Sequence, residues 1–251
     1  MQYIRSALFN LIMLVSTLVY AIPSVLTFPF PYATRYRFIT QWTRFNLWTL
    51  EHICGIRYSV RGLENIPNGP SIVVSKHQST WETLALQKIF PPHVWVLKRE
   101  LLFLPFFGWG LAMLEPIAIN RSAKTKAMEQ VLNQGADRLR NGRWVVVFPE
   151  GTRIPPGKKG RYKLGGAKLA EHTGVHLLPV AHNAGEFWAK RKFLKLPGTI
   201  QVVIGPPIDP KGKDAVTLNA MAEKWIEDEM LKITNRKFLD KEGKVQVHER
   251  R

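Results

Sequence analysis

The feature that most constrains this chain is an uncharged N-terminal run, because residues 6–34 contain no Asp, Glu, Lys or Arg. A membrane-crossing helix needs about 20 mostly apolar residues, so the run is long enough for one. Three prolines interrupt its second half. Since proline disrupts a helix interior, we expect a helix from about Ala7 to Tyr20 or Ala21 and a break after it. The run predicts a membrane anchor that either crosses the bilayer or dips into it and returns.

A secretory signal peptide is the alternative interpretation of the same run. Arg5 precedes the apolar residues, and Val19-Tyr20-Ala21 loosely resembles a cleavage site. Three arginines follow the run, however: Arg35, Arg37 and Arg44. The positive-inside bias therefore favours an anchor whose C-terminal side stays in the cytoplasm.

The segment after the anchor, residues 36–53, has aromatic residues at steps of four, three and three, namely Phe38, Trp42, Phe45 and Trp48. This spacing places them on one face of a helix. A helix in the lipid interface and a helix packed on the core both fit the pattern. We treat residues 1–55 as a membrane-anchoring region and residues 56–251 as one globular domain.

The charge balance indicates an anionic partner, because the net charge is +17 and the sequence pI is about 10.2. Nucleic acid, an anionic membrane surface and a phosphorylated substrate are all compatible with it. The single cysteine, Cys54, excludes an intramolecular disulfide framework and a cysteine-built zinc site.

Residues 56–251 alternate β-rich runs with helical stretches, which predicts an α/β fold with a mixed sheet flanked by helices. The expected strands are 57–60, 71–74, 94–97, 117–119, 144–148, 177–181 and 199–204. The expected helices are 80–88, 123–140 with Ser122 as N-cap, 165–172 and 218–234, and the polar tail 237–251 is expected to fray.

The first candidate for chemistry is His77, which follows a predicted strand, with Glu82 five positions later. A regular helix would place the two about 140° apart, so they meet only if His77 lies in the loop before the helix that carries Glu82. A carboxylate that orients an imidazole allows the ring to remove a proton from an attacking hydroxyl. Taken alone, the pair is better explained as solvated surface residues, because a His and a Glu this close together occur often by chance.

The second candidate is the turn after the predicted strand at 144–148, where Glu150, Gly151, Thr152 and Arg153 follow one another. Arginine binds phosphate through two parallel hydrogen bonds, and glycine allows close backbone approach. The following residues, 155–163, form a basic loop rich in turn residues, which fits either a phosphate-binding loop or a solvated loop.

A third element extends from Lys98 to Arg121, with a cation at each end and an aromatic centre around residues 103–109. Such an element suits a ligand with an apolar end and a phosphorylated end, but ordinary core packing is the more frequent cause of such a run. The other histidines, among them His93 and His182, have no metal-ligand pattern and are interpreted as surface or satisfied core residues.

Together these residues resemble the glycerolipid acyltransferase family, most closely its bacterial 1-acyl-sn-glycerol-3-phosphate acyltransferases. That family has a His-x4-Asp block, a Lys-to-Arg block with an internal Pro-x-Phe-Gly, a Phe-Pro-Glu-Gly-Thr-Arg block and a later apolar block with a proline. The matching segments, in the same order, are His77–Glu82, Lys98–Arg121, Phe148–Arg153 and Val175–Val180. The one departure is Glu82, which stands where the family usually has aspartate.

The resemblance implies transfer of a fatty acyl group from acyl-CoA or acyl carrier protein to the 2-hydroxyl of lysophosphatidate. His77 would be the base and Glu82 its orienting partner. Lys98, Arg121 and Arg153 would bind the phosphate, and the pocket would be shaped by Glu150, Gly151 and Thr152. No metal or prosthetic group is implied, because the acyl donor is a co-substrate. The implied location is the bacterial inner membrane, with the catalytic domain facing the cytoplasm.

Three other functions fit parts of the sequence. The same reaction on another lysolipid acceptor, such as a lyso-ornithine lipid, would use the same motifs. A non-catalytic basic protein that binds anionic membranes would explain the charge and the anchor but not the His77 and Glu82 pair. A nucleic-acid-binding protein would explain the charge, but the sequence has an apolar anchor and no recognisable nucleic-acid motif, so no nucleic-acid partner is expected.

Overall fold

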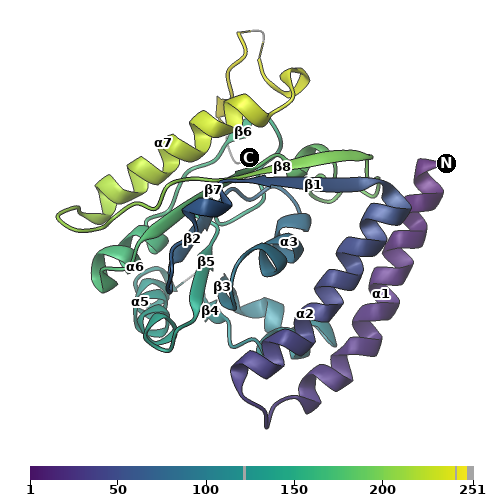
Figure 1. The fold of residues 1–251 in the computed structure, drawn as a ribbon, viewed down its shortest axis with the longest axis horizontal. Helices are drawn as coiled ribbons and strands as arrows, with labels where there is room; N and C mark the ends of the chain where they lie inside the picture. The colour runs from purple at the N-terminus through teal and green to yellow at the C-terminus, as the bar shows by residue number, and fades with distance from the viewer. Residues whose placement is uncertain (121–122, 241, 248–251) are drawn as a thin grey trace.

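The computed structural model describes residues 1–120, 123–240 and 242–247, and its centre is one mixed sheet (Figure 1). Within these residues the sheet has seven strands in the order β1-β8-β7-β2-β5-β3-β4. They are β1 (Ile56–Arg61), β2 (Ile72–Ser75), β3 (His93–Lys98), β4 (Ile117–Ile119), β5 (Trp144–Val147), β7 (Leu177–His182) and β8 (Gly198–Ile204). Neighbouring strands are parallel except β7 and β8, which are antiparallel. The predicted mixed sheet is confirmed.

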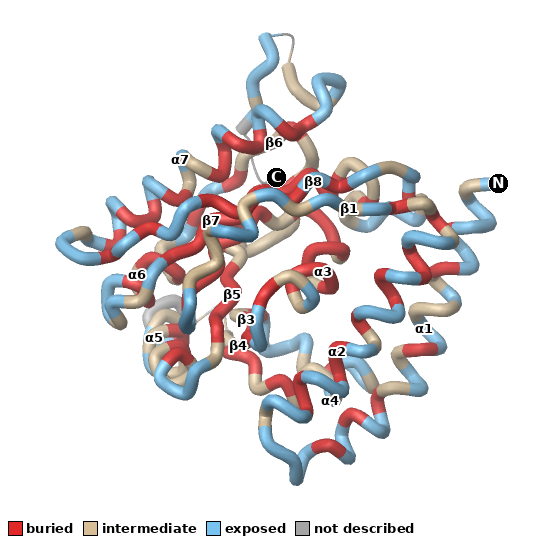
Figure 2. The backbone as a smooth tube through the Cα atoms, viewed as in Figure 1, coloured by how far each residue is buried: buried red, intermediate tan, exposed pale blue. Residues whose placement is uncertain are grey.

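The central strands have near-continuous apolar sequences because both faces of the sheet are covered. Every residue of β2, β5 and β7 is buried, and Figure 2 shows this buried centre. Alternate residues enter two different cores: Val73 packs on one face of β2, and Ile72 and Val74 pack on the other.

Helices cover the two faces of the sheet. The face that receives Val73 packs against α3 (Trp81–Ile89) and the N-terminal helices. The opposite face packs against α5 (Lys124–Arg140), α6 (Gly165–Thr173) and α7 (Ala215–Ile233). Helices α3, α5, α6 and α7 and the seven strands begin and end within three residues of their predicted bounds. The expected N-cap Ser122 lies outside the described residues.

The N-terminal helix differs from the prediction in its length. Helix α1 (Gln2–Leu26) continues through Pro23 instead of ending near Ala21. A proline removes one helical hydrogen bond, and tertiary packing can sustain the following turn. Here α1 packs along α2 and α4, and the buried Ser24 hydroxyl donates to the Tyr20 carbonyl at 2.6 Å. The length and apolar composition of α1 suffice for a membrane span.

Helix α2 (Tyr32–Thr49) runs antiparallel to α1 at one edge of the molecule (Figure 1). It continues into a π-helical turn, η1 (Leu50–Cys54). Phe38, Phe45 and Trp48 are exposed on its outer face, whereas Ile39 and Leu47 are buried. The helix therefore packs on the core with one face and presents aromatic side chains with the other, so the two interpretations of its sequence are compatible.

The N-terminal helices are also bonded to the rest of the chain. Gln2 donates to the Lys195 carbonyl at 2.5 Å, the Lys195 amide donates to the Ser6 hydroxyl at 3.0 Å, and Arg35 pairs with Glu115. These contacts hold α1 and α2 against the face of the sheet that carries α3.

Two short elements were not anticipated from the sequence. Helix α4 (Phe107–Ala112) is too short to show a period. In the tail that was expected to fray, β9 (Gln246–Val247) pairs with β6 (Lys158–Lys159) of the basic loop. The expectation that the tail frays was wrong for residues 246–247. The polar composition of the tail does not show that its backbone can form hydrogen bonds with a loop that is distant in the sequence.

His93 on β3 predicts a pH effect on stability. Its ring is fully buried, 3.0 Å from the Pro91 carbonyl and 3.2 Å from the Tyr36 hydroxyl, and burial lowers its pKa from 6.5 to about 4. Below pH 6.5 the unfolded chain binds a proton that the folded chain does not, so stability falls as the pH falls towards about 4. We expect a loss of up to about 1.4 kcal/mol per pH unit.

Thermal unfolding of wild type and His93→Gln at about pH 7.5 and pH 5 measures this effect. The unfolding temperature of the wild type should fall more than that of the variant on acidification. Equal shifts in the two proteins would assign the acid sensitivity to other groups.

Candidate active site

His77 and Glu82 meet at the C-terminal end of β2. The strand ends at Ser75, His77 lies in the loop that follows, and Glu82 is in the first turn of α3. His77 Nδ1 is 2.8 Å from Glu82 Oε1, which also accepts from the backbone amides of Gln78 at 2.8 Å and Ser79 at 2.7 Å. The same carboxylate therefore ties the loop before α3 to the first turn of the helix and orients the ring. A carboxylate on Nδ1 places the proton there and leaves Nε2 as an acceptor.

The environment of Glu82 favours its charged form. Its side chain is fully buried, which raises the pKa, but the neighbouring His182 and the hydrogen bonds from His77 and Ser79 lower it by more. The net pKa is below its ordinary value. An ionised carboxylate at this place stabilises the imidazolium that forms when His77 accepts a proton.

The His77 ring is also held by stacking. It lies 4.0 Å from the Phe148 ring at an interplanar angle of 15°, and Phe148 stacks on Trp95 at 5.5 Å and 14°. These contacts restrict the rotation of the imidazole about its side-chain bonds, so its Nε2 has a defined direction.

The peptide bond that precedes His77 is held from both sides. Its carbonyl, on Lys76, accepts from His182 Nε2 at 2.8 Å, and its amide, on His77, donates to Glu150 Oε2 at 3.0 Å. The next carbonyl, on His77 itself, accepts from the Ile154 amide at 2.7 Å. His182 is fully buried and hydrogen-bonded, as expected for a satisfied core histidine.

The structure gives Glu150 a different environment from the substrate pocket that its motif suggested. Its carboxylate is buried and receives Lys76 Nζ at 2.7 Å and the His77 amide, instead of facing a substrate. Burial raises its pKa, and the Lys76 ammonium opposes that shift. The geometry therefore gives Glu150 the role of holding the loop that carries His77.

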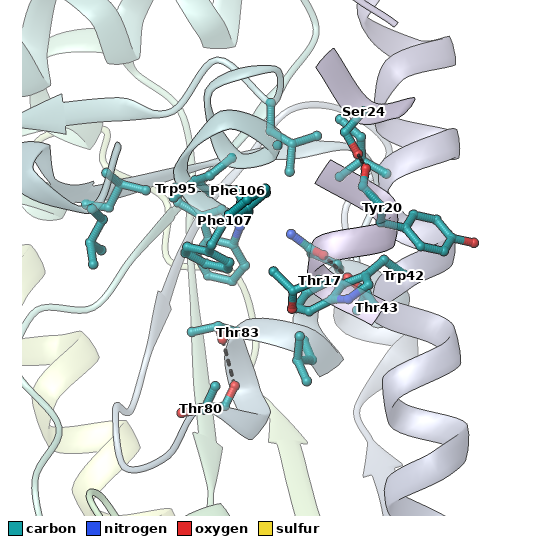
Figure 3. A pocket seen from close by; sticks show the side chains of 18 of the residues that line it. Thr17, Tyr20, Ser24, Trp42, Thr43, Thr80, Thr83, Trp95, Phe106 and Phe107 are labelled. Carbon is teal, nitrogen blue, oxygen red and sulfur yellow. Dashed lines mark hydrogen bonds between the residues drawn. The ribbon is translucent and has the colours of Figure 1, made fainter. Parts of the chain in front are cut away.

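A pocket of about 250 Å³ opens beside His77 and extends to the N-terminal helices. Figure 3 shows Thr17 and Trp42 from α1 and α2 on one side, and Trp95, Phe106 and Phe107 on the other. Most of the wall is apolar. Two cations, Lys98 and Arg153, line the pocket together with His77.

Gly151 and Thr152 directly precede Arg153 in the chain. Gly151 has φ +63°, where a side chain would be strained and would approach Lys163 Nζ to 2.9 Å. The Thr152 hydroxyl accepts from Lys190 Nζ at 3.0 Å. Arg121 lies outside the described residues, so its relation to the pocket is not described.

Sequence reasoning missed several contributors, including Lys76, Trp95 and Lys190. Phe148 lies within a recognised block but carried no assigned role. Lys76 is next to His77 in the chain, but its carboxylate partners come from distant segments, and the tertiary structure brings Trp95 to Phe148 and Lys190 to the turn that carries Arg153. Among the described residues, the structure has no group of three or more His, Cys, Asp or Glu side chains that could hold a metal ion.

Comparison with known proteins places the chain in a family. Residues 57–183 match the family model described as Acyltransferase. The 1-acyl-sn-glycerol-3-phosphate acyltransferase of Pseudomonas aeruginosa is 49% identical over 93% of both chains. The human 1-acyl-sn-glycerol-3-phosphate acyltransferase alpha is 30% identical over 72% of this chain and 65% of its own.

A solved structure has the same fold. The crystal structure of the 1-acyl-sn-glycerophosphate (LPA) acyltransferase PlsC from Thermotoga maritima superposes with a TM-score of 0.76 and covers 92% of this chain and 95% of that one, at 24% identity. The family model and the relative from Pseudomonas aeruginosa together show that the chain belongs to the acyltransferase family.

Proposed function

We propose that the protein transfers a fatty acyl group from acyl-CoA or acyl carrier protein to the 2-hydroxyl of lysophosphatidate, which makes phosphatidate. The observation that carries the proposal is the oriented His77 at the mouth of an apolar pocket flanked by Lys98 and Arg153. A lysophospholipid has a hydroxyl for the base, a phosphate for the cations and an acyl chain for the apolar wall. The names of the relatives support the same acceptor.

In the proposed reaction, His77 Nε2 removes the proton of the acceptor hydroxyl as its oxygen attacks the thioester carbonyl. The tetrahedral intermediate collapses, the carbon–sulfur bond breaks, and the imidazolium returns the proton to the leaving thiolate. Glu82 stabilises the imidazolium between the two proton transfers.

A direct transfer needs no acyl-enzyme, and the environments of the Ser79 hydroxyl and the Cys54 thiol fit that view. Ser79 is fully buried, and its Oγ accepts from the Trp81 amide at 3.1 Å, as a helix-capping hydroxyl does. Cys54 is fully buried at the end of η1, where its Sγ lies 3.7 Å from the Arg5 carbonyl.

The phosphate of the acceptor is proposed to bind Lys98, Arg153 and Arg121. Lys98 is half-exposed and pairs only with the exposed Glu100 at 3.2 Å among the ion pairs of the described chain, so an anionic ligand can compete for it. Gly151 and Thr152 shape the turn that presents Arg153, through the left-handed backbone of the glycine and the bond to Lys190.

The N-terminal helices are proposed to place the pocket at a membrane surface. The outer face of α1 exposes large apolar side chains such as Leu11, Leu14 and Ile22, which lipid would cover. The same helix lines the pocket with Thr17 and Ala21, so a lipid acceptor can reach it without crossing water. The excess of positive charge favours an anionic membrane, and the proposed location is the bacterial inner membrane with the sheet on the cytoplasmic side.

Acyl transfer by detergent-extracted protein tests the proposal. Lysophosphatidate and a panel of other lysolipids are the acceptors, with oleoyl-CoA and palmitoyl carrier protein as donors. Phosphatidate formed faster than any other product supports the proposed acceptor. Preference for another lysolipid would assign a different acceptor, and a folded protein that acylates none of them would contradict the proposal.

Shortening the orienting carboxylate should reduce the rate of this reaction. In Glu82→Asp the carboxylate cannot reach both His77 Nδ1 and the amides of Gln78 and Ser79, so either the ring or the helix start loses its partner. We expect kcat to fall about tenfold, as a small misplacement of a catalytic group does. The exposed Glu171→Asp is the control, and an unchanged kcat in Glu82→Asp would show that this loop readjusts to aspartate.

A further inference from the structure

A buried cluster of charges adjoins the His77 loop, and its members are not among the residues that line the pocket. It joins Lys76 of that loop, Glu150 of the turn after β5, Tyr162 of the basic loop and Glu227 of α7. Each of the four side chains is at most 7% exposed. An ammonium and two carboxylates with so little contact with water are stable only when they satisfy one another.

Lys76 is the centre of this cluster and uses all three of its N–H groups. Nζ donates to Glu150 Oε1 at 2.7 Å, to Glu227 Oε1 at 2.8 Å and to the Lys158 carbonyl at 3.3 Å. Burial lowers the pKa of Lys76, but the two carboxylates raise it by more, so the ammonium stays charged. Its position is therefore set by Glu227 as much as by Glu150.

The cluster reaches the catalytic loop through Glu150. One carboxylate oxygen of Glu150 accepts from Lys76 Nζ, and the other accepts from the His77 amide at 3.0 Å. A change in the position of the ammonium moves the carboxylate and, with it, the amide of His77. The remaining contact of Glu227 is the Tyr162 hydroxyl, which donates to it at 2.8 Å.

We infer that Glu227 is a positioning residue for acyl transfer, which holds the His77 backbone in place through Lys76 and Glu150. It lies on α7, outside residues 57–183, the part of the chain that matches the family model. The catalytic geometry therefore depends on a helix beyond the conserved motif blocks. This inference rests on the proposed role of His77 as the base.

The test compares two carboxylates of the same helix. Glu229 is 8% exposed, close to the 7% of Glu227, but it pairs with Arg61 at 3.3 Å and Lys232 at 2.8 Å instead of with the catalytic loop. Alanine and glutamine variants at both positions are assayed for kcat and for the KM of each substrate, and their thermal unfolding is recorded.

We expect Glu227→Ala to lower kcat about a hundredfold, because a displacement of about 1 Å at the base has an effect of that size. Glu227→Gln keeps an acceptor for Lys76 and Tyr162, so its kcat should fall only about tenfold. The KM values should change little, and the Glu229 variants should keep kcat within about twofold of the wild type.

A double-mutant cycle separates positioning from general destabilisation. If Glu227 acts through His77, Glu227→Ala should not reduce the residual activity of His77→Ala any further. Equal losses of kcat in the Glu227 and Glu229 variants, or an additive effect in the His77→Ala background, would overturn the inference. If Glu227→Ala does not fold, Glu227→Gln and Tyr162→Phe provide the same comparison.

A measurement without substrate keeps this inference distinct from the proposed function. Amide hydrogen exchange of the segment 76–80 should be faster in Glu227→Gln than in Glu229→Gln, because the Glu150 bond to the His77 amide is weakened only in the former. Wild-type protein that does not acylate lysophosphatidate would contradict the proposed function. Unchanged exchange in segment 76–80 would contradict the positioning role whatever the acceptor is.

Discussion

His77→Ala should reduce the kcat of acyl transfer by about 10²- to 10⁴-fold, the range that general-base catalysis contributes. The His77 ring lines the pocket, and its Nδ1 is already bonded to the ionised Glu82, which leaves Nε2 as the acceptor. Removing it leaves the acceptor hydroxyl with no base at that place, while the cations and the apolar wall are unchanged. We therefore expect KM to stay within about threefold. A steady-state assay of phosphatidate formation measures both parameters.

The control for this prediction is another histidine of the same chain. His172 is exposed in the last turn of α6, and His172→Ala should keep wild-type kinetics. The unfolding temperature of His77→Ala should fall by only a few degrees, because the buried Glu82 loses the ring but keeps the amides of Gln78 and Ser79. A folded His77→Ala with wild-type kcat would refute the proposed base, and a protein whose function survives this change would fit the non-catalytic membrane-binding interpretation.

Lys76→Met should destabilise the folded protein by about 3–5 kcal/mol, the usual cost of removing one partner from a buried ion pair. Glu150 and Glu227 would then lie next to each other in the interior with no cation between them. At about 2–4 °C per kcal/mol for a chain of this size, the unfolding temperature should fall by roughly 6–20 °C. Thermal unfolding followed by circular dichroism in detergent measures the shift.

Two further variants show whether the lost stability comes from the uncompensated charge. Lys232→Met removes an exposed lysine paired with Glu229 and should cost less than about 1 kcal/mol. Lys76→Met combined with Glu150→Gln and Glu227→Gln removes all three charges and should recover part of the stability without recovering kcat. A single Lys76→Met variant as stable as Lys232→Met would contradict the prediction.

The strands and helices of the α/β domain could be predicted from local patterns, because the apolar residues in their sequences are the ones that become buried. Strands such as β2 and β5 are short apolar runs, and helices such as α5 have an apolar period. The same reasoning failed for α1, which continues through Pro23, and for β9. In both cases the stabilising contacts come from other parts of the chain, namely α2 and α4 for α1 and the basic loop for β9.

The candidate site, too, could be predicted from the sequence only in part. The proximity of His77 and Glu82 could be anticipated from a separation of five residues, because the two share one loop and one helix start. The contact between Glu150 and the loop that carries His77 could not be anticipated. Its motif suggested that it shapes the substrate pocket, whereas the structure turns it towards Lys76, across a separation of 74 residues.

The sequence alone determined the order of strands and helices, the apolar N-terminal helix and the segments that carry the family's motifs, because each depends on residues that are neighbours in the chain. Only the tertiary structure decided what holds His77 in place. Lys76 and Glu227 are 151 residues apart, and they meet because β2 and α7 pack around the same core. A buried charge requires partners of opposite sign, and here the fold brings them from distant parts of the chain. No local sequence pattern can therefore identify them.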